Sequence, residues 1–388
     1  MRVYRSDVAY LKSAEARPPR SDHRLDEPTG LSLSMVASPQ CRFRFARQNH
    51  CSAAATSAAN FRKAHSGTDR SDLSLPKLKI MDKTRTIGGI IPPMLTPFDA
   101  EDRINESAHR AEVRYLVETA GVHGLAVCGS IGEGQTLSVE ETRELTAWTT
   151  EEVRSRIPVI TGIITNCTRS AFERGKAVAD LDVAALQITP PHYLFRPSDE
   201  AMLRYFATVF EKTGIPVIIY NVVPWSYLSP ALLARILREV DGVIGIKQST
   251  SDVKTLADLL LMQKEGLIPQ DKRILAAVDA LLYASFALGA HGAISGILAG
   301  APEWSVALWN AVQRGDHVQA LELHQKLLRF YNAFFAENRP ANLKTALKLQ
   351  GRDAGLPRPP MPPSSPEQVE KLRQVIETMG QSLATVER

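Results

Sequence analysis

Residues 242–247 read Gly-Val-Ile-Gly-Ile-Lys, and the rest of the chain is interpreted outward from this stretch. Val243, Ile244 and Ile246 form a short apolar run with β-branched side chains, which is typical of a strand buried on both faces. The run ends on Lys247, although burying an ammonium group is costly. This lysine is therefore either a solvated residue just beyond the strand or a functional amine at its carboxyl end.

An earlier apolar run, residues 215–219, ends on the polar pair Tyr220-Asn221, and one helix pattern separates the two runs. Parallel strands that are joined by a helical crossover bring their carboxyl ends to the same side of a sheet. We therefore expect the Tyr220 phenol to lie beside the Lys247 amine. A phenol next to a desolvated amine indicates Schiff-base chemistry.

Strand and helix patterns alternate eight times in the central part of the chain. Helix starts are marked by Ser138 with Glu141, a capping-box pattern, and by Ser229 before Pro230. This alternation predicts an α/β fold, a (β/α)8 TIM barrel over residues 81–300. A doubly wound open sheet is the alternative, but no glycine-rich dinucleotide motif follows the first strand. The apolar runs that read as strands are residues 87–95, 124–128, 159–164, 183–188, 215–219, 243–246, 274–278 and 293–295.

The two flanks of the barrel read differently. Residues 301–388 are expected to form a C-terminal helical region, with an extended proline-rich link at residues 356–366. Residues 1–80 show no sustained periodicity, so we expect a disordered extension or a segment upstream of a natural start at Met81. The acidic residues of this stretch argue against an organelle transit segment, and its low apolar content argues against a small accessory domain.

Charge and cysteine content exclude several classes of function. Residues 1–80 hold fourteen Lys or Arg and seven Asp or Glu; since the whole chain carries +4, residues 81–388 carry −3. The basic charge belongs to the extension and does not indicate a nucleic-acid partner.

The sequence contains no run of about 18 apolar residues, so it predicts no membrane span. We expect a cytoplasmic protein, with organelle import through residues 1–80 as the alternative. The four cysteines have no metal or disulfide spacing; they are Cys41, Cys51, Cys128 and Cys167.

Barrel enzymes place their chemistry at the carboxyl ends of the strands. Hydroxyl groups and one amine dominate these ends, and no cluster of His, Asp and Glu predicts a metal site. Glu133 lies in a Gly-Glu-Gly turn and is interpreted as a backbone anchor rather than an acid–base group. His192 and His291 are interpreted as structural. The residues at the strand ends are Thr96, Ser130, Ile131, Tyr193, Tyr220, Lys247, Ile294 and Ser295.

At these positions the chain resembles the dihydrodipicolinate synthase and N-acetylneuraminate lyase family of class I, pyruvate-type aldolases. The resemblance runs from Thr86 to about Met379, and its five segments occur in family order at family-like spacing. The segments are Pro-Pro-Met-Leu-Thr-Pro-Phe at 92–98, Gly-Ser-Ile-Gly-Glu-Gly at 129–134, Tyr-Asn-Val-Val-Pro at 220–224, Gly-Ile-Lys at 245–247 and Gly-Ala-His-Gly-Ala-Ile-Ser at 289–295.

The resemblance implies a mechanism that needs no cofactor beyond a covalent imine. Lys247 would condense with the ketone of pyruvate or a related 2-oxo acid. Tyr220 would act as general acid and base, linked to Ser130 in a proton relay. The backbone N–H groups of Ser130 and Ile131 would bind the 2-oxo acid carboxylate, and the Ile294 carbonyl would face the ligand. Tyr193 matches a position whose side chain, in family tetramers, reaches across an interface into the site of a neighbouring subunit. The resemblance therefore implies a homotetramer or at least a dimer.

Two departures from the family pattern concern the substrate. Ile131 stands where the family commonly has threonine, so one carboxylate-binding hydroxyl is missing. The family's synthases bind the carboxylate of their second substrate with an arginine soon after Tyr-Asn-Val-Pro, but no arginine occurs here before Arg235. Trp225 and Tyr227 instead indicate a larger or less charged acceptor, and we include Trp225 and Thr96 among the expected substrate-binding residues.

We therefore predict a Schiff-base lyase, of the aldolase or dehydratase/deaminase type, acting on pyruvate or a related 2-oxo acid. One alternative is 4-hydroxy-tetrahydrodipicolinate synthase of lysine biosynthesis, although the missing arginine predicts weak activity of that kind. A catalytically weak binding or regulatory barrel is the alternative from another class. The expected partners are a small-molecule 2-oxo acid and further copies of the chain, with no nucleic acid and no membrane.

Overall fold

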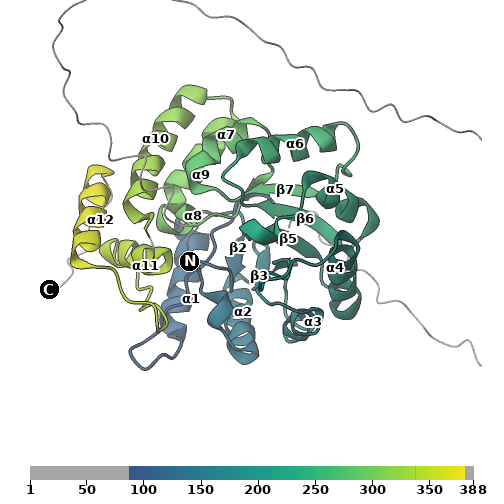
Figure 1. The fold of residues 1–388 in the computed structure, drawn as a ribbon. Coiled ribbons are helices and arrows are strands. Elements are labelled where there is room, and N and C mark those ends of the chain that lie inside the picture. The colour runs from purple at the N-terminus through teal and green to yellow at the C-terminus, as the bar shows by residue number, and fades with distance from the viewer. Residues whose placement is uncertain (1–86, 337, 381–388) are drawn as a thin grey trace, which may run out of the picture. The chain divides into compact units, whose positions relative to one another are not determined.

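The computed structural model describes residues 87–336 and 338–380, and the expectations for residues 1–80 lie outside the described residues. Eight parallel strands form one sheet in the order β1-β8-β7-β6-β5-β4-β3-β2 (Figure 1). A parallel bridge between Pro93 and Ala126 joins the first strand segment to β2, so the sheet closes into the predicted (β/α)8 barrel. The strands are β1 (Gly89–Ile90), β2 (Leu125–Val127), β3 (Val159–Ile163), β4 (Ala185–Ile188), β5 (Val217–Asn221), β6 (Val243–Gln248), β7 (Arg273–Ala276) and β8 (Gly292–Ala293).

Helices cover the outside of the barrel, and two of them begin at the caps that the sequence predicts. Ser138 and Glu141 form the capping box of α2, and Ser229 accepts a backbone N–H at the start of α5. The α-helices of the barrel are α1 (Glu106–Arg114), α2 (Val139–Val153), α3 (Thr168–Lys176), α4 (Asp199–Thr213), α5 (Pro230–Glu239), α6 (Val253–Lys264), α7 (Leu282–Ala287) and α8 (Ile297–Gly300). Shorter turns of π or 3-10 type are η3 (Tyr115–Thr119), η4 (Gly134–Thr136), η5 (Pro224–Ser226) and η6 (Asp279–Leu281).

In the described part of the chain, four further helices follow the barrel, as expected for a C-terminal helical region. They are α9 (Pro302–Gln313), α10 (His317–Phe334), α11 (Arg339–Leu349) and α12 (Pro366–Thr378). Helices α10 and α11 both contact α8, and α12 packs on α10 and α11, so these helices lie together against one side of the barrel (Figure 1). The Phe330 ring and the Leu343 side chain lie against Gly300, where a Cβ would overlap the ring. This packing brings the start of α11 close to the carboxyl ends of the strands.

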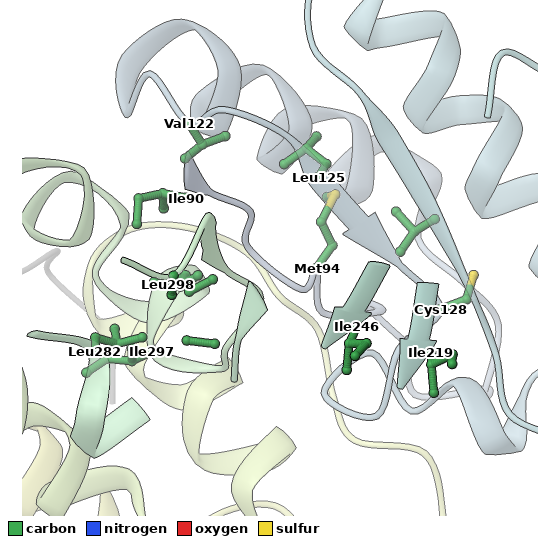
Figure 2. Close-up of a cluster of buried hydrophobic side chains, with 14 of the residues drawn as sticks. Ile90, Met94, Val122, Leu125, Cys128, Ile219, Ile246, Leu282, Ile297 and Leu298 are labelled. Atoms are coloured by element: carbon green, nitrogen blue, oxygen red, sulfur yellow. The ribbon is translucent and has the colours of Figure 1, made fainter. Parts of the chain in front are cut away.

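The apolar side chains form two layers, one inside the barrel and one between the strands and the helices. Figure 2 shows Ile219 and Ile246 on neighbouring strands, and both belong to the outer layer. Successive side chains of a strand point to opposite faces, so the next residues, Tyr220 and Lys247, point into the barrel. The alternation of the two strands therefore directs a phenol and an amine toward the interior.

His109 on α1 is a buried histidine that the fold holds neutral. The Thr149 hydroxyl donates to the Leu145 carbonyl at 2.7 Å, so it accepts the N–H of His109 Nε2 at 2.8 Å. The other ring nitrogen, Nδ1, is buried without a hydrogen-bond partner among the described residues. Burial lowers the pKa of His109 from 6.5 to about 4.

We expect the free energy of unfolding to fall as the pH drops from 6.5 to about 4. In this range the unfolded chain binds a proton that His109 does not bind in the folded protein, which corresponds to about 3 kcal/mol. Urea titrations at several pH values would measure this loss. His109→Gln should flatten the pH dependence, whereas the exposed control His317→Gln should keep it. An identical dependence in both variants would show that other groups cause it.

Candidate active site

A cavity of about 370 Å³ opens at the carboxyl ends of the barrel strands. Its wall includes residues that follow β2, β5, β6, β7 and β8 and residues from the C-terminal helical region. Six of the eight strand-end residues selected from the sequence line it together: Ser130, Ile131, Tyr220, Lys247, Ile294 and Ser295. The barrel therefore collects in one cavity side chains that lie up to 165 positions apart in the chain.

Lys247 and Tyr220 lie side by side, as predicted. They are paired in the register of β5 and β6, and the Lys247 Nζ atom lies 3.8 Å from the centroid of the Tyr220 ring. Both side chains are buried, and Lys247 is the single lysine among the described residues that line the cavity. An amine on the face of a phenol ring gains cation–π stabilisation when it is charged. Its nitrogen is also positioned to attack a carbonyl group in the cavity.

The turn after β2 forms the opposite wall. The Ser130 hydroxyl lies 3.3 Å from the Tyr220 hydroxyl, a long hydrogen bond of a length common in unliganded sites. The backbone N–H groups of Ser130 and Ile131 donate to no acceptor within the described residues, so they are available to an anion. Only glycine fits at Gly134, because a Cβ there would overlap the Cys128 carbonyl oxygen.

Glu133 anchors this turn, in agreement with the sequence interpretation. It has a left-handed backbone with a φ of 57° and a buried carboxylate. One carboxylate oxygen accepts from Lys344 Nζ at 2.6 Å, and the other accepts the Arg358 backbone N–H at 2.9 Å. Burial lowers the pKa of Lys344, while the charge of Glu133 and its hydrogen bond oppose this effect. The turn after β2 is thereby joined to α11 and to the link that follows it.

Asp279, directly after β7, was not identified from the sequence. It accepts the Ser295 hydroxyl at 2.5 Å and the Ile297 N–H at 2.6 Å, and so holds the turn after β8. Desolvation raises the pKa of Asp279, against these two hydrogen bonds and the positive charges of Arg339 and Lys247. Asp279 is therefore a positioning residue that lies within the electric field of both cations.

Arg339, the first residue of α11, also lines the cavity. Its guanidinium group lies 4.0 Å from the centroid of the Phe335 ring. The loop after Tyr220 lacks an arginine, as the sequence shows, but the cavity as a whole does not lack a guanidinium group. The cation comes instead from the C-terminal helical region, which packs its α11 start against the strand ends.

Three of the expected site residues do not line the cavity of the single chain. Tyr193 is 71% exposed and Trp225 is 60% exposed, and Trp225 Nε1 donates to the His192 carbonyl at 2.6 Å. Thr96 is buried and donates its hydroxyl to the Gly132 carbonyl at 2.6 Å, so it supports the turn after β2. The contacts of these residues with a ligand remain predictions.

The described residues contain neither a candidate metal site nor a candidate membrane span. No group of three or more His, Cys, Asp or Glu side chains in residues 87–336 and 338–380 could hold a metal ion. Within the same ranges, no helix combines the length and the apolar character that crossing a membrane requires.

Known proteins resemble this chain in sequence. A model of the dihydrodipicolinate synthetase family matches residues 86–379. The 4-hydroxy-tetrahydrodipicolinate synthase of Methanopyrus kandleri is 33% identical over 297 residues, which cover 76% of this chain and 97% of that protein. The enzyme of the same name from Nitrobacter hamburgensis is 35% identical over 284 residues, which cover 72% of this chain and 92% of that protein.

Solved structures resemble it as well. Dihydrodipicolinate synthase from Thermotoga maritima superimposes with a TM-score of 0.72 at 28% identity, covering 77% of this chain and 100% of that one. A prophage protein of the dihydrodipicolinic acid synthase family from E. coli K12, in complex with pyruvate, superimposes with a TM-score of 0.72 at 27% identity. The match covers 76% of this chain and 99% of that one.

The barrel, the lysine that ends a strand and the adjoining tyrosine define a class I lyase, an enzyme that forms a Schiff base with a 2-oxo acid. The chain belongs to the dihydrodipicolinate synthetase family.

Proposed function

We propose that Lys247 forms an imine with the ketone of pyruvate or a related 2-oxo acid, and that this imine is the reactive species of the enzyme. The observation that carries the proposal is the pairing of Tyr220 and Lys247 in the register of β5 and β6, with both side chains lining the cavity. The amine adds to the ketone and water leaves, which gives a protonated imine. The neighbouring carbon then loses a proton, and the protonated imine accepts the electron pair of that C–H bond, which gives an enamine. A covalent imine supplies this electron sink without a separate cofactor.

The neighbouring residues supply proton transfer and substrate orientation. Tyr220 gives and takes the protons of imine formation and of the substrate hydroxyl, and the Ser130 hydroxyl connects it to the cavity. The free N–H groups of Ser130 and Ile131 bind the 2-oxo acid carboxylate. The Ile294 carbonyl faces the same ligand. In the condensing direction, the enamine carbon bonds to an aldehyde carbon, the aldehyde oxygen takes a proton, and water releases the product from Lys247.

Trapping with a panel of 2-oxo acids tests this function. Borohydride should reduce the imine and leave one covalent adduct per chain, which peptide mass spectrometry would place on Lys247. The 2-oxo acid that is trapped at the lowest concentration identifies the donor substrate. A protein that traps no 2-oxo acid would favour the binding or regulatory barrel instead.

We further infer a homo-oligomer, a tetramer or a dimer, in the cytoplasm. Tyr193 and Trp225 are large, exposed aromatic residues, and the Trp225 indole donates to the loop that carries Tyr193. Such a surface is typical of an interface between subunits. One structural neighbour is described as the first monomeric dihydrodipicolinate synthase variant.

Tyr193→Ala is expected to lower kcat about tenfold or more without changing the amount of 2-oxo acid that is trapped, because the tyrosine would complete a neighbouring site. Light scattering and turnover would be measured at the same protein concentration. The matched control is Val318→Ala, an exposed residue of α10 that does not line the cavity. The exposed residue Phe335 is unsuitable as a control because it lines the chain's own cavity. A fully active wild-type monomer would contradict the role of Tyr193.

A further inference from the structure

A second cavity lies outside the active site, among the helices that follow the barrel. Its volume is about 240 Å³, and none of the described residues lines both this cavity and the one at the strand ends. Its walls are one face of α11, residues 355–364 of the link after it, and α12. Helices α11 and α12 pack against each other (Figure 1). The apolar residues of the wall are Ala341, Leu349, Leu356, Pro357, Pro363 and Val369.

The charged residues of this second cavity are all cations. They are Lys344, Lys348 and Arg373, and no Asp or Glu of the described chain lines the cavity. Lys344 has a counter-ion, since its ammonium donates to Glu133 at 2.6 Å. Lys348 is exposed, and its ammonium has no ion pair or hydrogen bond in the part of the chain that the structure describes. Arg373 Nε lies 3.7 Å from the Glu370 carboxylate, longer than a hydrogen bond, so its N–H groups are available to an acceptor.

Apolar walls with two available cations fit one class of ligand, a small organic acid with an apolar body. The body gains free energy by leaving water, and its carboxylate gains charge-assisted hydrogen bonds. Drug-sized ligands occupy pockets of about 300–1,000 Å³, so this cavity suits a smaller molecule. A sugar fits less well, because the wall's hydroxyl groups already bond within the fold. Thr345 donates to Ser364 at 2.9 Å, and Ser364 donates to Asn342 at 2.8 Å.

The wall of the second cavity is connected to the active site. Lys344 lines the cavity and binds Glu133, which holds the turn that presents two backbone N–H groups to the 2-oxo acid. Lys344 also donates to the Leu356 carbonyl at 2.5 Å, so its ammonium joins α11, the link and the turn after β2. A ligand between α11 and the link would fix these segments against each other and strengthen the anchor of the turn.

We propose that the second cavity binds a small carboxylic acid with an apolar body, held by Lys348 and Arg373, and that the bound acid raises the affinity of the active site for the 2-oxo acid. Binding at the second cavity does not depend on the proposed function, whereas its effect on the active site rests on that function. Because coupling between two sites is reciprocal, the 2-oxo acid should in turn tighten the binding of the second acid.

Calorimetry of the full-length protein with 4-phenylbutyrate and its uncharged amide, 4-phenylbutanamide, tests the site. The acid should bind about tenfold more tightly than the amide, as expected for a charge-assisted contact. Lys348→Gln and Arg373→Gln should each weaken the binding of the acid and leave that of the amide unchanged. Val369→Trp should fill the cavity and abolish the binding of both. Arg339→Gln, in the active-site cavity, and the exposed control Arg169→Gln should leave the binding of the acid unchanged.

Borohydride trapping supplies the second readout. Saturating 4-phenylbutyrate should lower the pyruvate concentration that gives half-maximal trapping about fivefold, at the lower end of typical coupling between sites. The double variant Lys348→Gln/Arg373→Gln should abolish this shift. Lys344→Met should still bind 4-phenylbutyrate but lose the shift, because the contact between the cavity wall and Glu133 is gone.

Several outcomes would overturn the proposal. The acid and the amide would bind equally, Arg339→Gln rather than Lys348→Gln would weaken the acid, or the bound acid would leave pyruvate trapping unchanged. Binding that appears only when an oligomer is diluted would show that a second copy of the chain covers the cavity, and would also overturn it. If no pyruvate adduct forms, the proposed function fails and the effect on the active site fails with it, whereas a calorimetric preference for the acid would still establish the site.

Discussion

Lys247→Ala should abolish the borohydride-trapped pyruvate adduct and lower turnover on the order of 10⁴-fold or more. Alanine removes the amine that forms the imine, and no other lysine among the described residues lines the cavity. Peptide mass spectrometry of the wild-type protein should place the adduct on the β6 peptide. Turnover with pyruvate and an aldehyde, measured by pyruvate consumption, gives the second readout. The variant should fold, since alanine is tolerated at a cavity wall.

The other buried lysines explain why the adduct should be specific. Lys272 donates to the Val243 carbonyl at 2.8 Å, and Lys344 donates to Glu133 at 2.6 Å. Both amines are held by the fold, and neither belongs to the residues that line the cavity. Lys254→Ala, which removes an exposed amine paired with Asp258, is the matched control and should retain the adduct. Labelling of another lysine, or labelling that survives Lys247→Ala, would contradict the mechanism.

The pair of Tyr220 and Lys247 could be predicted because its geometry follows from local rules. Each residue ends an apolar run, the two runs are joined by a helix, and parallel strands place their ends on one side. The helix starts at Ser138 and Ser229 could be predicted for the same reason, since capping depends on neighbouring residues.

Other elements could not be predicted because their sequence signals are weak. The first strand is only Gly89–Ile90, although the apolar run extends over residues 87–95, because Pro92 and Pro93 have no N–H to donate to a ladder. Helix α3 was not identified, since only Ala171 and Gly175 are buried on it. An amphipathic pattern is too faint when so few apolar residues face the core.

Arg339 could not be predicted because its place in the site depends on tertiary packing. It follows Lys247 by 92 positions and lies outside the eight strand–helix units. The sequence analysis looked for a cation in the loop after Tyr220 and found Trp225 there. Only the contacts of α10 and α11 with α8 bring the start of α11 to the cavity. The arginine before Pro340 is visible in the sequence, but nothing in the sequence places it near the strand ends.

Lys344→Met should lower the free energy of unfolding by about 3–5 kcal/mol, because it leaves the Glu133 carboxylate buried without its cation. Both side chains are almost fully buried, at 2% and 3% exposure, so water cannot replace the lost charge. The melting temperature should fall by about 10 °C. Lys348→Met, an exposed change one helical turn further along α11, is the control and should have little effect.

The same substitution should also impair the site, because the ion pair joins two of its walls. Glu133 fixes the turn that presents the Ser130 and Ile131 N–H groups, and Lys344 lies on the helix that begins with Arg339. We expect a higher KM for the 2-oxo acid as well as for the acceptor in Lys344→Met. Adding Glu133→Gln to this variant should recover part of the stability, since no unpaired charge is then buried. A double variant that is less stable than Lys344→Met would show that the hydrogen bond from the Arg358 backbone N–H is enough to stabilise the buried carboxylate.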